Sequence, residues 1–199
     1  MSRVYHDPKT KFLYQQQRQF QTVEYVTDMH KKYNSRTMEC INIWDAVMSL
    51  NSLVDMSDPD ISLSNVHHLF QTAEMMRVAG EPEWMQVTGL VHDLGKIMYL
   101  WGNNMDGTSL VTQWGVVGDT FVVGCRIPDS CVYPEFNDLN MDMYDDRYKS
   151  STGMYNKGCG MNNVKCSWGH DEYLYKVLVD NNTPLSKNRE AMAMVRFHS

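Results

Sequence analysis

The chain contains a His-Asp pair, His92-Asp93, inside the largely apolar run GLVHDLGKIMYLWG at residues 89–102. Its apolar residues recur at helical spacing, which predicts a helix over 83–100 that ends at Gly102. Neighbouring helical side chains point about 100° apart, because a helix turns once per about 3.6 residues. A His there can bind one metal ion while the adjacent carboxylate, which has two oxygens, reaches a second. The pair therefore predicts a helical fold built around a dinuclear metal site, provided that further ligands converge on it.

Helical periodicity covers most of the chain. The apolar spacing predicts helices at about 9–33, 43–53, 66–78, 83–100, 168–179 and 185–198. Asn65 is a suitable N-cap for the third of these. By contrast, β-branched and aromatic residues flank Gly118-Asp119 in 113–125, which favours a short hairpin, and 126–165 shows little periodicity. The expected fold class is mostly α, a helical bundle with at most a small β-hairpin.

Composition narrows the class of protein. A length of 199 residues suits a single domain with a substantial core. The net charge of -6 and the absence of a basic cluster argue against nucleic acid or an anionic membrane as a partner. No segment approaches the roughly 20 apolar residues that span a bilayer, and the polar N-terminus lacks a signal peptide's apolar stretch. The five scattered cysteines favour free thiols, so a cytoplasmic protein is expected.

Three further histidines are candidate ligands, namely His68 on the third predicted helix, His170 at the start of 168–179, and His198 near the chain end. Imidazole and carboxylate ligands together suit iron or another first-row metal better than calcium or magnesium. Helix bundles build metal sites by directing ligands from several helices at one centre. Each residue also has an ordinary interpretation: a lone His68 is more often a partly buried histidine than a ligand, and Asp171 is typical of a helix-capping carboxylate.

The spacing of His68 and His92-Asp93, 24 residues apart on successive predicted helices, resembles the HD-domain superfamily of helical metal-dependent proteins. The flanking segments narrow this resemblance to the myo-inositol oxygenase family. They are LNSLVDMSDPD (50–60), HLFQTAE (68–74), LVHDLGK (90–96), QWGVVGDTFVVGC (113–125), RYKSSTGMY (147–155), SWGHDEYLY (167–175) and RFHS (196–199). The resemblance covers most of the chain from about Gln21, with 103–112 as an insertion. It implies that residues 1–199 form a single HD-like helical domain.

The resemblance implies a non-haem di-iron oxygenase. Such an enzyme cleaves the ring of myo-inositol with O2, gives D-glucuronate and water, and works with an Fe2+/Fe3+ pair. On this basis His68 and His92 would bind one iron. Asp93 would bridge both irons, and His170 and His198 would bind the second.

The resemblance also implies substrate contacts. An uncharged polyol offers only hydroxyl groups, so its site needs several polar side chains to orient it. Lys96 is the catalytic candidate, because its ammonium could stabilise the acidified hydroxyl of a metal-bound alcohol. Its position four residues after His92 predicts the same helix face, although a solvated lysine has the same spacing. The implied substrate-binding residues are Asp55, Lys96, Gly118, Asp119, Ser199 and, over a short N-terminal match, Arg3.

The family pattern also includes a further carboxylate ligand and a second lysine beyond the RFHS segment. The chain has neither after Ser199, so a C-terminally shortened protein is expected, with either retained or impaired catalysis. One alternative is an HD-type phosphohydrolase whose metals activate water. Apart from Lys96 there is no Arg/Lys cluster near the motifs that could hold a phosphate, and His170 and His198 add imidazole to the second site, so the sequence disfavours the phosphohydrolase. A catalytically impaired remnant is the other alternative. A monomer is expected.

Overall fold

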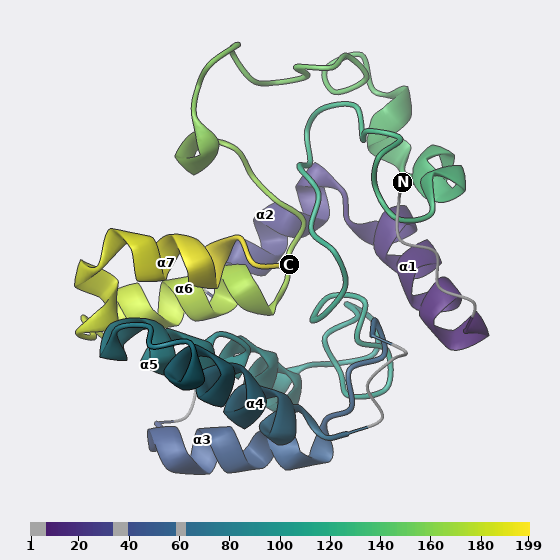
Figure 1. Ribbon diagram of the computed structural model, residues 1–199. Coiled ribbons are helices and arrows are strands. Elements are labelled where there is room, and N and C mark those ends of the chain that lie inside the picture. The colour runs from purple at the N-terminus through teal and green to yellow at the C-terminus, as the bar shows by residue number, and fades with distance from the viewer. Residues whose placement is uncertain (1–6, 34–39, 59–62) are drawn as a thin grey trace.

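The computed structural model describes residues 7–33, 40–58 and 63–199, and its elements are predominantly helical (Figure 1). The α-helices are α1 Pro8–Phe20, α2 Val23–Lys32, α3 Ile43–Ser49, α4 Asn65–Val78, α5 Glu83–Val91, α6 His170–Asp180 and α7 Arg189–Arg196. The 3-10 helices are η1 Leu50–Ser52, η2 Leu94–Trp101, η3 Pro134–Leu139, η4 Met141–Tyr144, η5 Met161–Asn163 and η6 Leu185–Lys187. The prediction of a mostly α fold is confirmed.

The helices that matter for function pack around one region. In Figure 1, α4 and α5 lie between α3 below and α6 and α7 above. Helix α4 packs along α5, while α6 packs against both η2 and α7. The segment 126–165, with its short 3-10 helices, passes around the α1 end of the molecule, and the final residue lies beside α6. Segments distant in sequence therefore meet where α4, α5, η2, α6 and α7 come together.

The prediction of one continuous helix over 9–33 is wrong, because the chain forms two helices there, α1 and α2, with a break at Gln21. Thr22 caps α2 by accepting a hydrogen bond from the Tyr25 amide at 3.2 Å. The Gln21 side chain is fully buried. It accepts from the Trp168 amide and donates to the Trp168 carbonyl, each at 2.7 Å. The Gln21 side chain at this break therefore connects the N-terminal helices to the backbone just before α6.

The hairpin predicted in 113–125 does not form, although all of these residues are described. The only β-type pairing there is an isolated antiparallel bridge between Val122 and Cys166. Gly118 has a φ of 103°, a value that favours glycine, and its flanking segments do not pair. The Val116 carbonyl instead accepts from the His170 backbone amide at 3.0 Å. The apolar residues of this stretch therefore support the start of α6 rather than a hairpin.

The long helix predicted over 83–100 is also interrupted. Helix α5 ends at Val91, a turn holds His92 and Asp93, and η2 then continues to Trp101. Gly102 ends the element as predicted. His92 and Asp93 are therefore not mid-helix residues, although His92 keeps helical backbone angles.

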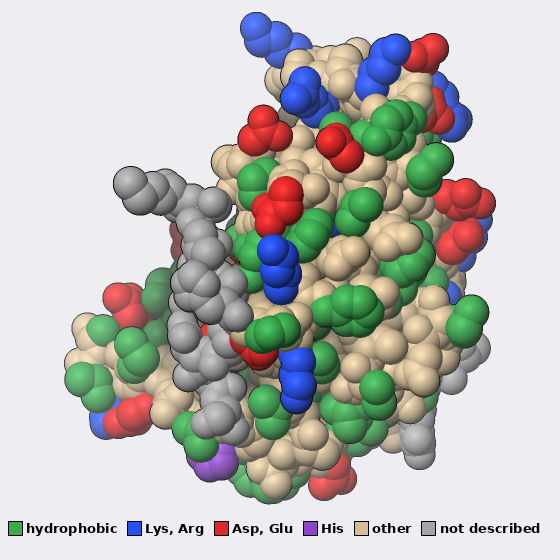
Figure 2. All heavy atoms as spheres, turned by 90° about the vertical axis from the view of Figure 1, so that its right-hand side faces the viewer, with side chains coloured by type: hydrophobic (Ala, Val, Ile, Leu, Met, Phe, Trp, Pro, Cys, Tyr) green, Lys and Arg blue, Asp and Glu red, His purple; other side chains and the backbone are tan. Residues whose placement is uncertain are grey.

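The molecular surface mixes charges of both signs. On the face shown in Figure 2, basic and acidic side chains lie interspersed among hydrophobic ones. The five cysteines all fall in the described ranges and are free thiols, as predicted. Within those ranges, none of the helices combines the length and apolar character that a bilayer crossing requires.

Replacing Gly95 with alanine should separate η2 from α6. A Cβ at this position would lie 1.9 Å from the His170 carbonyl oxygen and 2.9 Å from Leu174 Cβ, both on α6. Backbone atoms cannot move aside cheaply, so we expect Gly95→Ala to lower the free energy of unfolding by about 1–3 kcal/mol. Gly89→Ala is the matched control, since its Cβ would meet only flexible side-chain atoms such as Met76 Sδ at 2.7 Å. Equal Tm values for the two variants would contradict this prediction.

His30 should make the fold acid-sensitive. Burial, followed by the nearby cations Lys176, Lys165 and Arg196, lowers the pKa of His30 to about 4. Protonation between pH 6.5 and 4 therefore favours the unfolded chain, in which the histidine has its ordinary pKa, and stability falls as the pH falls through that range. We expect His30→Asn to flatten this part of the pH dependence of unfolding. The exposed His67→Asn serves as control, and identical curves for both variants would argue against a role of His30.

Candidate metal centre

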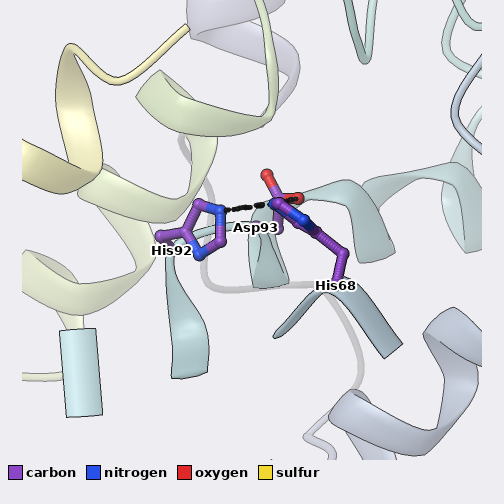
Figure 3. Close-up of side chains that lie close together, drawn as sticks. All are labelled: His68, His92 and Asp93. Atoms are coloured by element: carbon purple, nitrogen blue, oxygen red, sulfur yellow. Dashed lines mark hydrogen bonds and ion pairs between the residues drawn. The ribbon is translucent and has the colours of Figure 1, made fainter. Parts of the chain in front are cut away.

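The structure brings all five predicted metal ligands together from four parts of the chain. His68 lies in the first turns of α4, and His92 and Asp93 occupy the turn between α5 and η2. His170 is the first residue of α6, and His198 lies two residues beyond α7. Figure 3 shows the His68 and His92 side chains converging on Asp93. The ligand candidates form two groups, and Asp93 belongs to both.

The first group consists of His68, His92 and one oxygen of Asp93. The Nε2 atoms of His68 and His92 are 3.2 Å apart. They lie 3.6 Å and 3.7 Å, respectively, from Asp93 Oδ2. The Asp93 side chain is only 4% exposed, whereas that of His68 is 34% exposed. This group is therefore open to solvent on the His68 side.

The second group uses the other oxygen of Asp93. His170 Nε2 and His198 Nε2 are 2.9 Å apart. They lie 3.0 Å and 3.3 Å from Asp93 Oδ1. Asp93 therefore turns one carboxylate oxygen to each pair of imidazoles, which is the arrangement of a bridging ligand.

In three of the four histidines, the hydrogen bond made by Nδ1 determines whether Nε2 carries a proton. The Nδ1 atoms of His92, His170 and His198 lie 2.7, 2.7 and 2.9 Å from the carbonyl oxygens of Gly89, Val116 and Val195. A carbonyl can only accept, so each Nδ1 carries the proton and each neutral ring keeps a lone pair on Nε2. Lone pairs that face each other repel unless a cation or a proton lies between them.

The separations within each group fit a metal ion. With metal–nitrogen distances of about 2.1 Å, neighbouring ligand atoms lie about 3.0–3.4 Å apart in octahedral or tetrahedral geometry. The observed separations span 2.9–3.7 Å. Nitrogen and carboxylate oxygen donors are typical of iron, zinc and related metals. The residues present therefore fit a pair of first-row metal ions that share Asp93.

Lys96 lies beside the shared carboxylate. Its Nζ donates to Asp55 Oδ2 at 2.7 Å, to Asp93 Oδ2 at 2.8 Å and to Asn65 Oδ1 at 2.9 Å. The predicted helix does not continue from His92 to Lys96, so the ammonium reaches the centre from η2 and not along a shared helix face. Burial lowers the pKa of Lys96, but the two carboxylates outweigh it and the net direction is upward. The ammonium therefore stays charged at neutral pH.

The electrostatics keep His92 and Asp93 in their metal-binding forms. Burial, assisted by the imidazoles of His198 and His68, lowers the pKa of His92 to about 4 against the opposing effect of Asp93. Burial alone would raise the pKa of Asp93, yet Lys96 and the two neighbouring imidazoles hold it well below its usual value. A neutral imidazole and an ionised carboxylate are the states in which these side chains bind metals.

A cavity of about 170 Å³ opens onto the two groups of ligands. Its floor is the metal centre, and its wall includes other predicted site residues, namely Asp55, Lys96, Gly118, Asp119 and Ser199. Arg3 lies outside the described residues. The Asp119 carboxylate accepts a hydrogen bond from Tyr14 at 2.8 Å. The predicted substrate residues that the structure describes thus share one cavity with the predicted ligands.

Several residues around the cavity were missed as site residues. Asn65 is not the N-cap of α4 but its first residue, since Ser64 precedes the helix, and its side chain contacts Asp93 and Lys96. Its position three residues before His68 on one helix could have indicated this. The others are listed with their contacts: Ser57 donates to Asp55, Tyr14 donates to Asp119, Asp171 accepts from Ser199, and Thr120 donates to the Ser199 carbonyl.

The comparisons with known proteins agree with this site. Residues 7–199 match the family model described as myo-inositol oxygenase. The chain is 47% identical over 182 residues to an inositol oxygenase from Mus musculus, which covers 90% of this chain and 60% of the relative. It is 38% identical over 190 residues to an inositol oxygenase from Dictyostelium discoideum, a match that covers 94% of this chain and 63% of the relative. It is also 38% identical over 180 residues to inositol oxygenase 1 from Arabidopsis thaliana, covering 90% and 56%.

The chain thus spans about 60% of the length of the curated relatives that it matches. The match nevertheless covers nearly all of this chain, including every described residue of the metal centre and its cavity. The chain belongs to the myo-inositol oxygenase family.

Proposed function

We propose that the chain carries the active site of an oxygenase that cleaves myo-inositol with O2 by means of two iron ions. His68 and His92 would hold one ion and His170 and His198 the other, with Asp93 bridging them. The observation that carries the proposal is that the two oxygens of Asp93 face two separate pairs of imidazoles. The family membership supports iron over the other metals that this ligand set suits.

The proposed reaction balances with one O2 per inositol. The ring C–C bond between two hydroxyl-bearing carbons breaks; one carbon becomes a carboxylate and the other an aldehyde. One oxygen atom of O2 enters the carboxylate and the other leaves as water, which gives D-glucuronate. The iron pair, when bound, would supply the redox chemistry that O2 needs in order to react with an alcohol.

The protein groups around the cavity would orient the polyol. Lys96 already uses its three N–H donors on Asp55, Asp93 and Asn65. A substrate oxygen that approaches Lys96 must therefore replace one of these acceptors. We propose that it replaces Asp55, because Asp55 and Asn65 both line the cavity but Asn65 is also held by its hydrogen bond to Asp93. The ammonium would then stabilise the developing alkoxide while the released Asp55 carboxylate accepts its proton.

Oxygen uptake tests this function directly. The chain is loaded with Fe2+ without oxygen, and O2 consumption is then followed with myo-inositol and with cyclohexanol, which lacks the additional hydroxyls. We expect inositol-dependent uptake with D-glucuronate as product, and no uptake with cyclohexanol. Release of phosphate from nucleotide or phosphonate-type esters would instead support the phosphohydrolase alternative. Inertness in both assays of a chain that binds two irons would overturn the proposal for this chain.

A further inference from the structure

We infer that Asn65 is a positioning residue that holds the Asp93 carboxylate in its bridging orientation. This inference rests on the proposed metal pair. Asn65 is 4% exposed, and neither the predicted ligand set nor the predicted substrate contacts include it. Its amide lies between the two charged groups at the centre, the Asp93 carboxylate and the Lys96 ammonium.

The hydrogen bonds of Asn65 have a fixed direction. Nδ2 donates to Asp93 Oδ2 at 3.1 Å, and Oδ1 accepts from Lys96 Nζ at 2.9 Å. Rotating the amide by 180° would direct its NH2 group at an ammonium and its oxygen at a carboxylate, so the opposite orientation is excluded. Asn65 therefore acts as a neutral donor toward Asp93 and as a neutral acceptor toward Lys96.

An amide suits this position better than the alternatives. An aspartate would place a third carboxylate beside Asp93 and Asp55, and an apolar residue would leave a buried charged pair with fewer hydrogen bonds. The donated N–H also limits rotation of the Asp93 carboxylate about its last torsion, which otherwise has a broad minimum. This limit on rotation keeps Oδ2 toward His68 and His92 while Oδ1 faces the other pair.

The backbone of Asn65 connects the same parts of the site. The backbone N–H of Asn65 donates to the Leu53 carbonyl at 3.0 Å. Leu53 is two residues before Asp55, so this bond holds the start of α4 against the segment that carries Asp55. His68 follows Asn65 by three residues on α4, so the two side chains lie on the same helix face. Asn65 therefore connects the segment that carries Asp55, the helix that carries His68, and the shared carboxylate of Asp93.

Metal binding by variants of the whole chain tests this inference, with Mn2+ as the probe. Asn65→Leu keeps the number and branching of the side-chain heavy atoms and removes both hydrogen bonds. We expect its affinity for at least one of the two ions to fall about 10–100-fold, the usual effect of losing a partner of a metal ligand. The electron paramagnetic resonance spectrum should also change from that of a coupled Mn2+ pair toward that of isolated ions. Asn65→Ala leaves room for a water that can donate to Asp93, so its loss should be smaller.

A matched control separates positioning from folding. Asn140 is equally buried, 1% exposed, and its side chain donates to the backbone of Arg18 and Gln21. Asn140→Leu should lower Tm while the Mn2+ affinity and the coupled spectrum stay unchanged. The inference is overturned if Asn65→Leu binds two coupled ions as tightly as the unmodified chain, or if Asn140→Leu weakens binding equally. Oxygen uptake is measured separately, so a failure of the proposed inositol chemistry would not alter this result.

Discussion

Asp93→Asn should abolish the metal pair, because no other described residue contributes a ligand atom to both groups. The change replaces one carboxylate oxygen with an NH2 group, which cannot bind a metal ion. One pair of imidazoles would then face the NH2 group, and the other pair would face a neutral amide oxygen in place of a carboxylate oxygen. Losing a residue that hydrogen-bonds to a metal ligand lowers metal affinity by up to roughly 100-fold. Asp93 is itself a ligand, so we expect the affinity for both ions to fall by more than that and inositol-dependent oxygen uptake to disappear.

The measurement is the number of iron ions per chain after anaerobic loading and desalting, with the Tm of the metal-free protein alongside. The metal-free fold should change little, since Lys96 keeps Asp55 and Asn65 as acceptors. Asp106→Asn is the control, a partly buried carboxylate that pairs with Lys32 away from the centre. Retention of two tightly bound ions by Asp93→Asn would show that the ligand assignment is wrong.

The sequence predicted the helices better than it predicted their interruptions. Apolar periodicity identifies a helix because every turn buries the same face, and the helices α4 and α6 begin within two residues of the predicted starts. The breaks at Gln21 and at His92-Asp93 leave that periodicity almost intact. They exist because Gln21 pairs with Trp168 and because Asp93 faces residues of α6 and the chain end, and such tertiary contacts carry no local signal.

The candidate site was predictable only in part and for the same reason. The His-Asp pair, the other three histidines and the family resemblance indicated a metal centre, and the structure brings these residues together. The spacing from His68 places Asn65 on the same helix face, but periodicity alone could not show its hydrogen bond to Asp93 or the hydrogen bond from Tyr14 to Asp119, 105 residues away. The expected monomer, the cytoplasmic location, the absence of nucleic-acid or membrane partners and the role of Arg3 stay predictions.

Lys96→Met should have the second large effect, on both stability and catalysis. Methionine has a similar shape but removes the only cation that contacts Asp55 and Asp93 among the described residues. The buried Asp93 carboxylate and the partly buried Asp55 carboxylate would then lie close together without the ammonium that contacts both. Removing one partner of a buried pair costs about 3–5 kcal/mol, and we expect a loss of that size in the metal-free chain at neutral pH. Inositol-dependent oxygen uptake should fall to background, since the ammonium that would stabilise the alkoxide is removed.

The pH dependence identifies the cause of this loss. Burial raises the pKa of Asp55, but Lys96 more than compensates, and the net direction is downward. In the unmodified chain Asp55 therefore stabilises the fold above its unfolded pKa, and this contribution disappears on acidification. Without Lys96 the effect of burial dominates, the pKa of Asp55 rises, and the carboxylate destabilises the fold as the pH rises through that value. The stability difference between Lys96→Met and the unmodified chain should therefore be smaller at pH 4 than at pH 7.

Chemical denaturation at the two pH values, with and without a divalent metal, separates the contributions of the two carboxylates. Bound metal would neutralise Asp93 but not Asp55, so it should restore only part of the lost stability. The double variant Lys96→Met/Asp55→Asn should recover much of the rest while remaining inactive. Lys31→Met is the control, because its exposed pair with Asp28 contributes at most about 1 kcal/mol. A Lys96→Met chain as stable as this control at pH 7 would mean that water reaches the two carboxylates, and that Lys96 is not the buried counterion on which its proposed role depends.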